Sequence, residues 1–234
     1  MNRTKEELLT AMADAVVRYD HDGPFSTAIS MRPIESLMRD IILEPDRVRE
    51  LLAFCVDASL DWVNYFHSST GCTSVTIADP VTTTDIIGKR FFDEFTRPEF
   101  KRLFDGITDI TGIKPKAHLC GHTSQLWDDL IDIGLENLSF DNCESMKEAA
   151  EKLGSSMFIS GNVGTVDIMR DGSIDDVIED VKRCIREGSE SARGVMISTG
   201  CQLPIGTKQE NIDAFIYAVH KYSAGARIGK RIEI

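Results

Sequence analysis

The stretch KPKAHLCGHTSQLWDDLIDIGLENLSFD, residues 114–141, decides the predicted fold. Its first part, 114–121, has the composition of a buried strand that closes on glycine, and 135–141 predicts a second strand. Between them, residues 124–133 predict a helix, and Gly134 stands where its C-cap is expected. A strand, a helix and a second strand in this order are typical of a parallel sheet with helices outside it.

The same alternation extends along the whole chain. We expect further helices at the ranges 4–20, 34–42, 45–66, 85–95, 98–111, 145–153, 174–187 and 211–222. We expect six strands, at 23–30, 72–79, 114–120, 135–141, 155–161 and 194–200. A closed (β/α) barrel has eight strands. Six strands therefore fit either an open doubly wound sheet or a barrel that lacks its first two units.

Composition excludes several classes of function. The formal net charge of -12 argues against a surface for nucleic acid or an anionic membrane, because such partners need clustered Lys and Arg. The sequence has no apolar run of the roughly 18 residues that a membrane span needs, and its charged N-terminus is not typical of a secretory signal. The six cysteines are scattered, which indicates reduced thiols and a cytoplasmic location.

Polar residues gather at the predicted carboxyl ends of the strands, where parallel α/β folds place their active sites. These residues are Asp79, His118, Cys120, Asp141, Asn162 and Cys201. A structural role is an equal alternative for Asp79, Asp141 and Asn162, because Asp and Asn at such positions often start a turn or cap a helix. We predict that Asp79, Asp141 and Asn162 line a catalytic pocket.

Three of these residues predict a zinc site. His118 and Cys120 are two positions apart in a strand, so their side chains point the same way. Cys201 ends another strand, and in a curled sheet it faces the same centre. One imidazole and two thiolates form a donor set suited to Zn²⁺, with a fourth position left for water or substrate.

The remaining cysteines do not fit this pattern. Cys55 and Cys184 lie within predicted helices, Cys72 opens a strand at the opposite end, and Cys143 sits in a loop. A zinc site rich in thiolate polarises water weakly but keeps a bound substrate thiol deprotonated. This chemistry favours alkyl transfer to sulfur over hydrolysis.

Several segments resemble the uroporphyrinogen decarboxylase superfamily, and most of all its zinc-dependent methylcobamide:thiol (coenzyme M) methyltransferases. The similar segments cover about residues 23–222 and include HLCG (118–121), LENLSFD (135–141), ISGNV (159–163), RDGSIDDVIEDVKRCIREG (170–188) and STGCQLPIGTKQENIDAF (198–215). GPFSTAISMRPIESLMRDIILEPDRV (23–48) is similar to the family segment that begins at the third barrel strand.

The resemblance implies a TIM-type (β/α) barrel that lacks its first two β/α units, with an N-terminal helix over 1–22 and the incomplete barrel over 23–234. It implies His118, Cys120 and Cys201 as the Zn²⁺ ligands. It also implies methyl transfer between a corrinoid (methylcobamide) on a partner corrinoid protein and a zinc-bound thiol or a related acceptor or donor, as part of one-carbon metabolism. A carboxylate such as Asp141 is then a candidate fourth ligand.

Two alternatives follow from the missing units. The decarboxylases of the family use groups on the first two strands, so decarboxylation on the same scaffold is the less favoured alternative. The second alternative is a non-catalytic subunit that completes the barrel of another family member. Missing strands expose pairing edges and an apolar lumen, so we expect a homo-oligomer or a complementary subunit that covers the opening.

Overall fold

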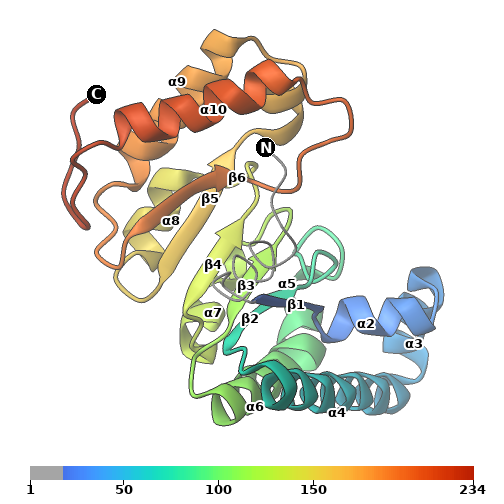
Figure 1. Ribbon diagram of the computed structural model, residues 1–234. Helices are drawn as coiled ribbons and strands as arrows, with labels where there is room; N and C mark the ends of the chain where they lie inside the picture. The colour runs from blue at the N-terminus through green and yellow to red at the C-terminus, as the bar shows by residue number, and fades with distance from the viewer. Residues whose placement is uncertain (1–17) are drawn as a thin grey trace, which may run out of the picture.

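A computed structural model describes residues 18–234, which form one parallel sheet with helices along its outer face (Figure 1). The strands follow each other in the sheet in chain order: β1 (Arg18–Asp22), β2 (Ser74–Ala78), β3 (Lys116–Leu119), β4 (Asn137–Phe140), β5 (Phe158–Val163) and β6 (Val195–Thr199). Each strand pairs in parallel with the next. The carboxyl ends of all six strands therefore lie on one side of the molecule.

The helices connect these strands and pack against one another in sequence. They are α2 (Pro24–Met31), α3 (Ile34–Leu43), α4 (Pro45–Thr70), α5 (Gly88–Phe91), α6 (Arg97–Thr111), α7 (Trp127–Ile133), α8 (Met146–Leu153), α9 (Ile174–Gly188) and α10 (Gln209–Tyr222), with short turns η1 (Phe92–Thr96), η2 (Ser124–Leu126) and η3 (Thr165–Arg170). None of the helices in residues 18–234 has the length and apolar character needed to cross a membrane.

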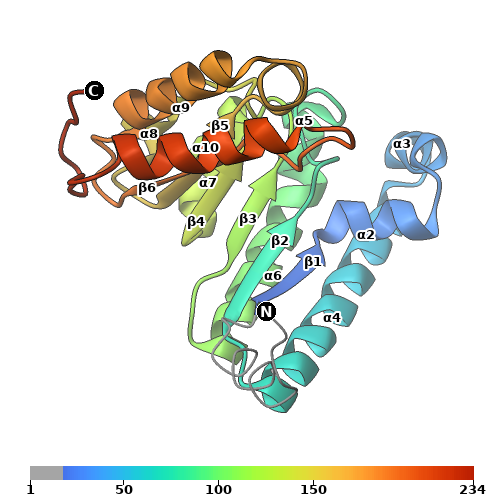
Figure 2. The ribbon, with the colours of Figure 1, turned by 45° about the horizontal axis from the view of Figure 1, so that its top comes forward.

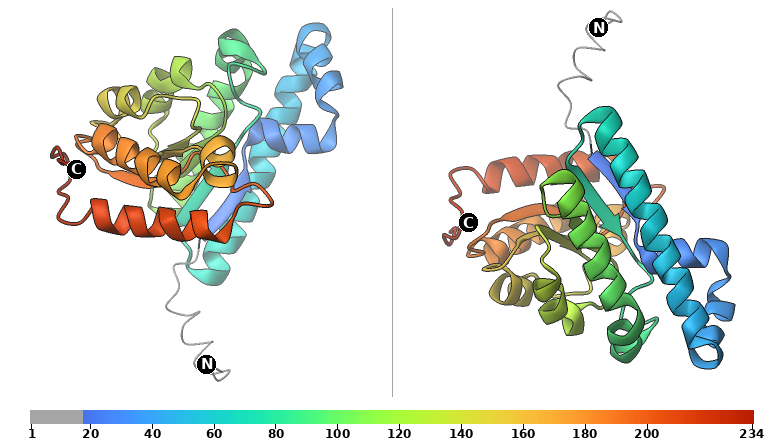
Figure 3. Two further views of the ribbon diagram at one scale, coloured as in Figure 1. Left: turned by 90° about the horizontal axis from the view of Figure 1, so that it is seen from above. Right: turned by 90° about the horizontal axis from the view of Figure 1, so that it is seen from below.

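The sheet is not closed. β1 and β6 are its two outer strands, and they lie at opposite edges in Figure 2; Figure 3 shows the same sheet from above and from below. An alternating α/β chain with six consecutive parallel strands and an open side is a partial TIM-type barrel, as the sequence predicts. Five of the six predicted strands lie where they are expected, within a few residues at each end.

The first strand is the exception. The predicted strand over 23–30 is wrong, because Pro24–Met31 forms the helix α2. The strand that pairs with β2 is Arg18–Asp22, which falls inside the predicted N-terminal helix. Residues 1–17, which carry the rest of that predicted helix, lie outside the described residues.

A contact from a distant part of the chain explains α2. The carboxylate of Asp79, directly after β2, accepts hydrogen bonds from the backbone N–H groups of Phe25 (3.1 Å) and Ser26 (3.0 Å) and from the Ser26 hydroxyl (2.6 Å). Pro24 at the first helical position needs no N–H partner. The N-terminus of α2 is thus satisfied by a residue that local sequence does not reveal.

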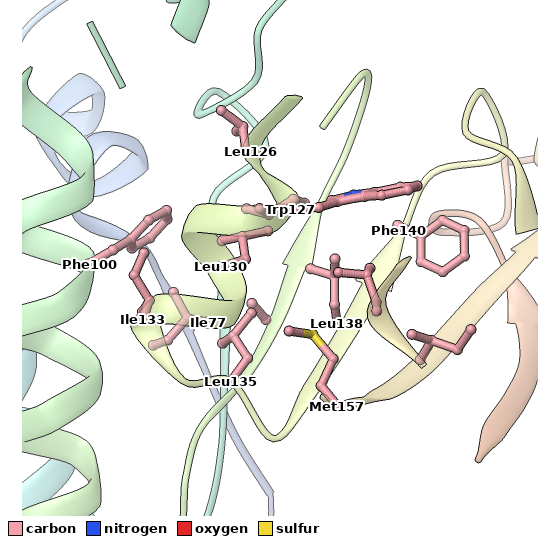
Figure 4. Packing of buried hydrophobic residues seen from close by; sticks show 14 of the residues in the cluster. Ile77, Phe100, Leu126, Trp127, Leu130, Ile133, Leu135, Leu138, Phe140 and Met157 are labelled. Atoms are coloured by element: carbon pink, nitrogen blue, oxygen red, sulfur yellow. The ribbon is translucent and has the colours of Figure 1, made fainter. Parts of the chain in front are cut away.

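The outer face of the sheet carries the apolar core. Alternate strand residues such as Ile77 and Leu138 are buried there, and α7 packs onto them with Trp127 and Leu130 (Figure 4). Phe140 meets the Trp127 ring edge-on at 6.5 Å between centroids. This alternation produces the parallel sheet's buried side, since every second side chain of a strand faces the helices.

The inner face of the sheet differs from its outer face. A groove of about 710 Å³ runs along it. Its lining combines apolar residues, such as Phe158 and Met196, with many polar ones. The polar residues include Thr76, Lys116, His118, Asn137, Ser139, Ser160, Ser198 and Cys201. The open side of the sheet therefore exposes a surface of mixed polar and apolar character. The expectation that another chain covers this opening stays a prediction.

Candidate metal centre

His118, Cys120 and Cys201 meet at the carboxyl ends of β3 and β6. Their donor atoms all lie within 4.8 Å of one another, and each residue is partly buried. The Nε2 atom of His118 is 3.0 Å from the Cys120 sulfur, and the sulfurs of Cys120 and Cys201 are 3.3 Å apart. The structure thus brings together the three residues that sequence analysis predicts as metal ligands.

Two features of the strands produce this arrangement. His118 lies in β3 with its side chain on the inner face, and Cys120 continues the same face just past the strand end. Cys201 follows β6, 81 residues further along the chain. Curling of the sheet brings β6 round to face β3 across the groove (Figure 3).

The surroundings of His118 orient its imidazole and favour the neutral form. Its Nδ1 atom lies 3.0 Å from the hydroxyl of Ser139, the residue opposite it in β4. If Nδ1–H donates to this hydroxyl, the lone pair of Nε2 faces Cys120. Burial lowers the pKa of His118, which favours the neutral imidazole that a metal requires.

The two thiols also fit a bound cation. Burial and, after it, the neighbouring Cys201 raise the pKa of Cys120 to about 12, so two adjacent thiolates are unfavourable at neutral pH without a positive charge. Tetrahedral zinc places two thiolates about 3.8 Å apart and a nitrogen and a thiolate about 3.6 Å apart. The His118–Cys120 and Cys120–Cys201 pairs need to separate by only roughly 0.5 Å to reach these distances.

Asp79 is drawn away from this centre. It is fully buried, and its two carboxylate oxygens are engaged by α2. Burial raises the pKa of Asp79 to about 6 although its hydrogen bonds act in the opposite direction. These contacts indicate a capping role, and the pocket role stays a prediction.

Asp141 and Asn162 lie closer to the centre but face its supporting backbone. The Asp141 carboxylate accepts hydrogen bonds from the N–H groups of Gly121 (3.0 Å) and Cys143 (3.2 Å). Asn162 is fully buried, and its amide donates to the carbonyls of Asp141 (3.2 Å) and Glu144 (2.7 Å). Asp141 does not belong to the cluster of donor atoms within 4.8 Å.

Three further residues around the centre were not predicted from the sequence. Ser139 contacts His118, Asp85 accepts from the N–H of His122 (3.0 Å), and Glu144 accepts from the N–H of Ser124 (2.7 Å). The period-two pattern of β4 placed Ser139 on the face of His118 and was a usable signal. Asp85 and Glu144 lie in irregular loops, where no periodic pattern exists.

Comparison with known proteins places this geometry in a family. The model of the uroporphyrinogen decarboxylase (URO-D) family matches residues 7–222. A methylcobamide:CoM methyltransferase from Methanosarcina barkeri is 25% identical over 206 residues, which cover 87% of this chain and 57% of that protein. A methylated-thiol–coenzyme M methyltransferase from Methanosarcina mazei is 26% identical over 84% of this chain and 50% of its own length.

The chain is also similar to a decarboxylase and to a methyltransferase of known structure. A uroporphyrinogen decarboxylase from Hordeum vulgare is 22% identical over 80% of this chain and 54% of that protein. The solved structure of a methyltransferase from Methanosarcina mazei superposes with a TM-score of 0.76 at 22% identity and covers 91% of this chain and 63% of that one. The chain thus spans little more than half the length of the curated relatives it matches.

Proposed function

The chain belongs to the uroporphyrinogen decarboxylase family, and from this premise we propose that it transfers a methyl group between a corrinoid on a partner protein and a thiol held at zinc. The observation that carries the proposal is the convergence of His118, Cys120 and Cys201 on one point of the inner groove. The Methanosarcina relatives are methyltransferases that act on coenzyme M, and this likeness supports the same reaction class.

The three residues have separate tasks in this proposal. Zinc at this site supplies a positive charge that keeps a substrate thiol deprotonated at neutral pH. His118, oriented by Ser139, provides the neutral ligand, and Cys120 and Cys201 provide two negative ones. A centre with this donor set favours a nucleophilic sulfur over an activated water.

In the overall reaction, the substrate sulfur forms a bond to the methyl carbon as the cobalt–carbon bond of the methylated corrinoid breaks. The electron pair of that bond stays with the corrinoid, and the thiol proton leaves to solvent. The acceptor is a thiol or a related group, and the reverse direction, from a methylated donor to the corrinoid, uses the same residues.

Exposed apolar side chains occur in the segments that follow several strands, and they support docking of the corrinoid protein at this end of the sheet. Ile205 is fully exposed, four residues after Cys201. The other members are Ile86 after β2, Val166 and Ile174 after β5, and Leu203 after β6. Transfer requires the reacting atoms to approach within about 3–3.5 Å, so a protein that carries the corrinoid has to contact this rim.

Metal analysis tests the proposed zinc site. We expect wild type to bind about one zinc per chain, Cys201→Ala to lose it, and Cys143→Ala, which removes an exposed thiol outside the cluster, to keep it. Zinc retained in full by Cys201→Ala contradicts the site. Demethylation of methylcobalamin in the presence of candidate thiols then tests the activity, and its absence in zinc-loaded wild type contradicts the reaction.

The open edges support a second candidate, association with a further copy or a complementary subunit. β1 and β6 each have one side without a strand partner in residues 18–234. Unpaired strand edges are pairing sites that soluble proteins normally cover. Light scattering tests this candidate: a species larger than one chain supports it, and a compact monomer at all concentrations contradicts it.

A further inference from the structure

The loop directly after Cys120 is held by carboxylates from neighbouring loops. Four consecutive backbone N–H groups each donate to a side-chain carboxylate: Gly121 to Asp141 (3.0 Å), His122 to Asp85 (3.0 Å), Thr123 to Glu144, and Ser124 to Glu144 (2.7 Å). Hydrogen bonds to an ionised acceptor are among the stronger ones in proteins. This loop therefore depends on side chains from elsewhere for its shape.

Glu144 contributes the most to this support. It is only 8% exposed, and one oxygen, Oε1, accepts from both Thr123 and Ser124. These two bonds fix the segment three and four residues beyond Cys120. Gly121, with φ of 69°, gives the loop a turn that side chains rarely adopt, so the loop needs outside contacts to hold one conformation.

Asn162 holds Glu144 in place. Its side-chain amide donates to the carbonyls of Asp141 and Glu144, the first and last residues of the turn after β4. The thiol of Cys184 in α9 donates to the Asn162 side-chain oxygen at 3.6 Å. A chain of hydrogen bonds thus runs from β5 through the turn after β4 to the loop that follows Cys120.

We propose that Glu144 is a positioning residue for Cys120: through the Thr123–Ser124 backbone it sets the place of the Cys120 sulfur relative to His118 and Cys201. The inference rests on the metal site of the proposed function. A ligand has to be held within about 0.5 Å of its productive position, and supporting contacts commonly change metal affinity 10–100-fold. Glu144 acts here as a hydrogen-bond acceptor for backbone, outside the cluster of donor atoms.

Cobalt(II) binding to chelator-treated full-length protein tests this role. Glu144→Ala removes the acceptor, and we expect its Co²⁺ affinity to fall 10–100-fold with a weaker thiolate-to-cobalt absorption band. Glu144→Gln keeps an oxygen at the same place for both N–H groups, so we expect it to restore most of the affinity and the band. Glu148→Ala, an exposed glutamate four residues later on α8, is the matched control and should behave as wild type.

Hydrogen exchange of the metal-free protein gives an independent reading. We expect faster exchange at residues 121–124 in Glu144→Ala, with the rest of the sheet unchanged, and wild-type exchange in Glu144→Gln. Unchanged exchange and unchanged cobalt binding in a folded Glu144→Ala overturn the inference. Equal loss of cobalt in Ala and Gln variants overturns it too, because the charge and not the hydrogen bonds is then required. Wild type that binds no cobalt contradicts the proposed function instead.

Discussion

At the end of β2, Asp79 is fully buried and gives both carboxylate oxygens to donors of α2. At the end of β3, one strand further along the sheet, His118 and Cys120 turn their side chains toward Cys201 across the groove. The two ends are in direct contact, since the Asp79 N–H donates to the His118 carbonyl at 3.2 Å. Neighbouring positions of one fold thus have different roles.

The difference lies in what surrounds the polar atoms. The Asp79 carboxylate is surrounded by backbone donors, so its hydrogen bonds stabilise the folded chain. The sulfur of Cys120 has mainly other donor atoms as neighbours, and this arrangement benefits from a cation. We therefore expect changes at the β2 end to alter stability, and changes at the β3 and β6 ends to alter metal binding.

Replacement of Asp79 by alanine should have the largest effect. It leaves the buried donors of Phe25 and Ser26 without an acceptor, at about 1–3 kcal/mol for each unsatisfied group, so the free energy of unfolding should fall by about 3 kcal/mol or more. Denaturant unfolding measures this change. Asp109→Ala, an exposed position on α6, is the control. A midpoint for Asp79→Ala equal to that of the control contradicts the capping role.

The titration of Asp79 should also make the free energy of unfolding depend on pH. Because the folded pKa of Asp79 is raised to about 6, its protonated form is favoured in the folded state. The stabilisation of the folded state that comes from this raised pKa is fully present below about pH 4 and is lost as pH rises through about 6. For two pKa units it amounts to about 3 kcal/mol of unfolding free energy. The difference in unfolding free energy between wild type and Asp79→Asn should narrow over this range. A difference independent of pH contradicts the shift.

Zinc should stabilise the protein by binding at the carboxyl ends of β3 and β6. At a free zinc concentration of 100 times Kd, the wild-type free energy of unfolding should rise by about 2.7 kcal/mol, because only the folded chain assembles the three donors. Cys201→Ala should gain little under the same conditions, and Cys143→Ala should match wild type. Thermal unfolding with and without zinc measures the effect. Equal stabilisation of wild type and Cys201→Ala places the metal elsewhere.

The smallest effect is expected for Cys201→Ala in the absence of metal. Cys201 is partly exposed and is not a member of the buried apolar cluster, so the unfolding free energy should change by less than about 1 kcal/mol. Chelator-treated wild type and variant are compared by denaturant unfolding. A loss as large as that of Asp79→Ala would remove the contrast between the two strand ends.

Five of the six strands were predictable because their residues combine β-branched or apolar character with turn signals at both ends. The segment 23–30 was predicted as a strand on the same local grounds, but its helix is capped by Asp79, 53 residues after Ser26. The sequence also did not predict the mixed lining of the inner groove. The inner groove combines alternating polar residues of β3 and β4 with apolar residues, and this mixture can be seen only once the sheet's inner face is known.

By itself, the sequence determined the alternating α/β order and the types of donor available, because both depend on patterns of adjacent residues. It also placed His118 and Cys120 on one face, since strands have a period of two. Only the tertiary structure decided that Cys201 reaches them, that Asp79 caps α2, and that Glu144 holds the loop after Cys120. These contacts join residues 20 to 81 positions apart, and local preferences carry no information about such distances.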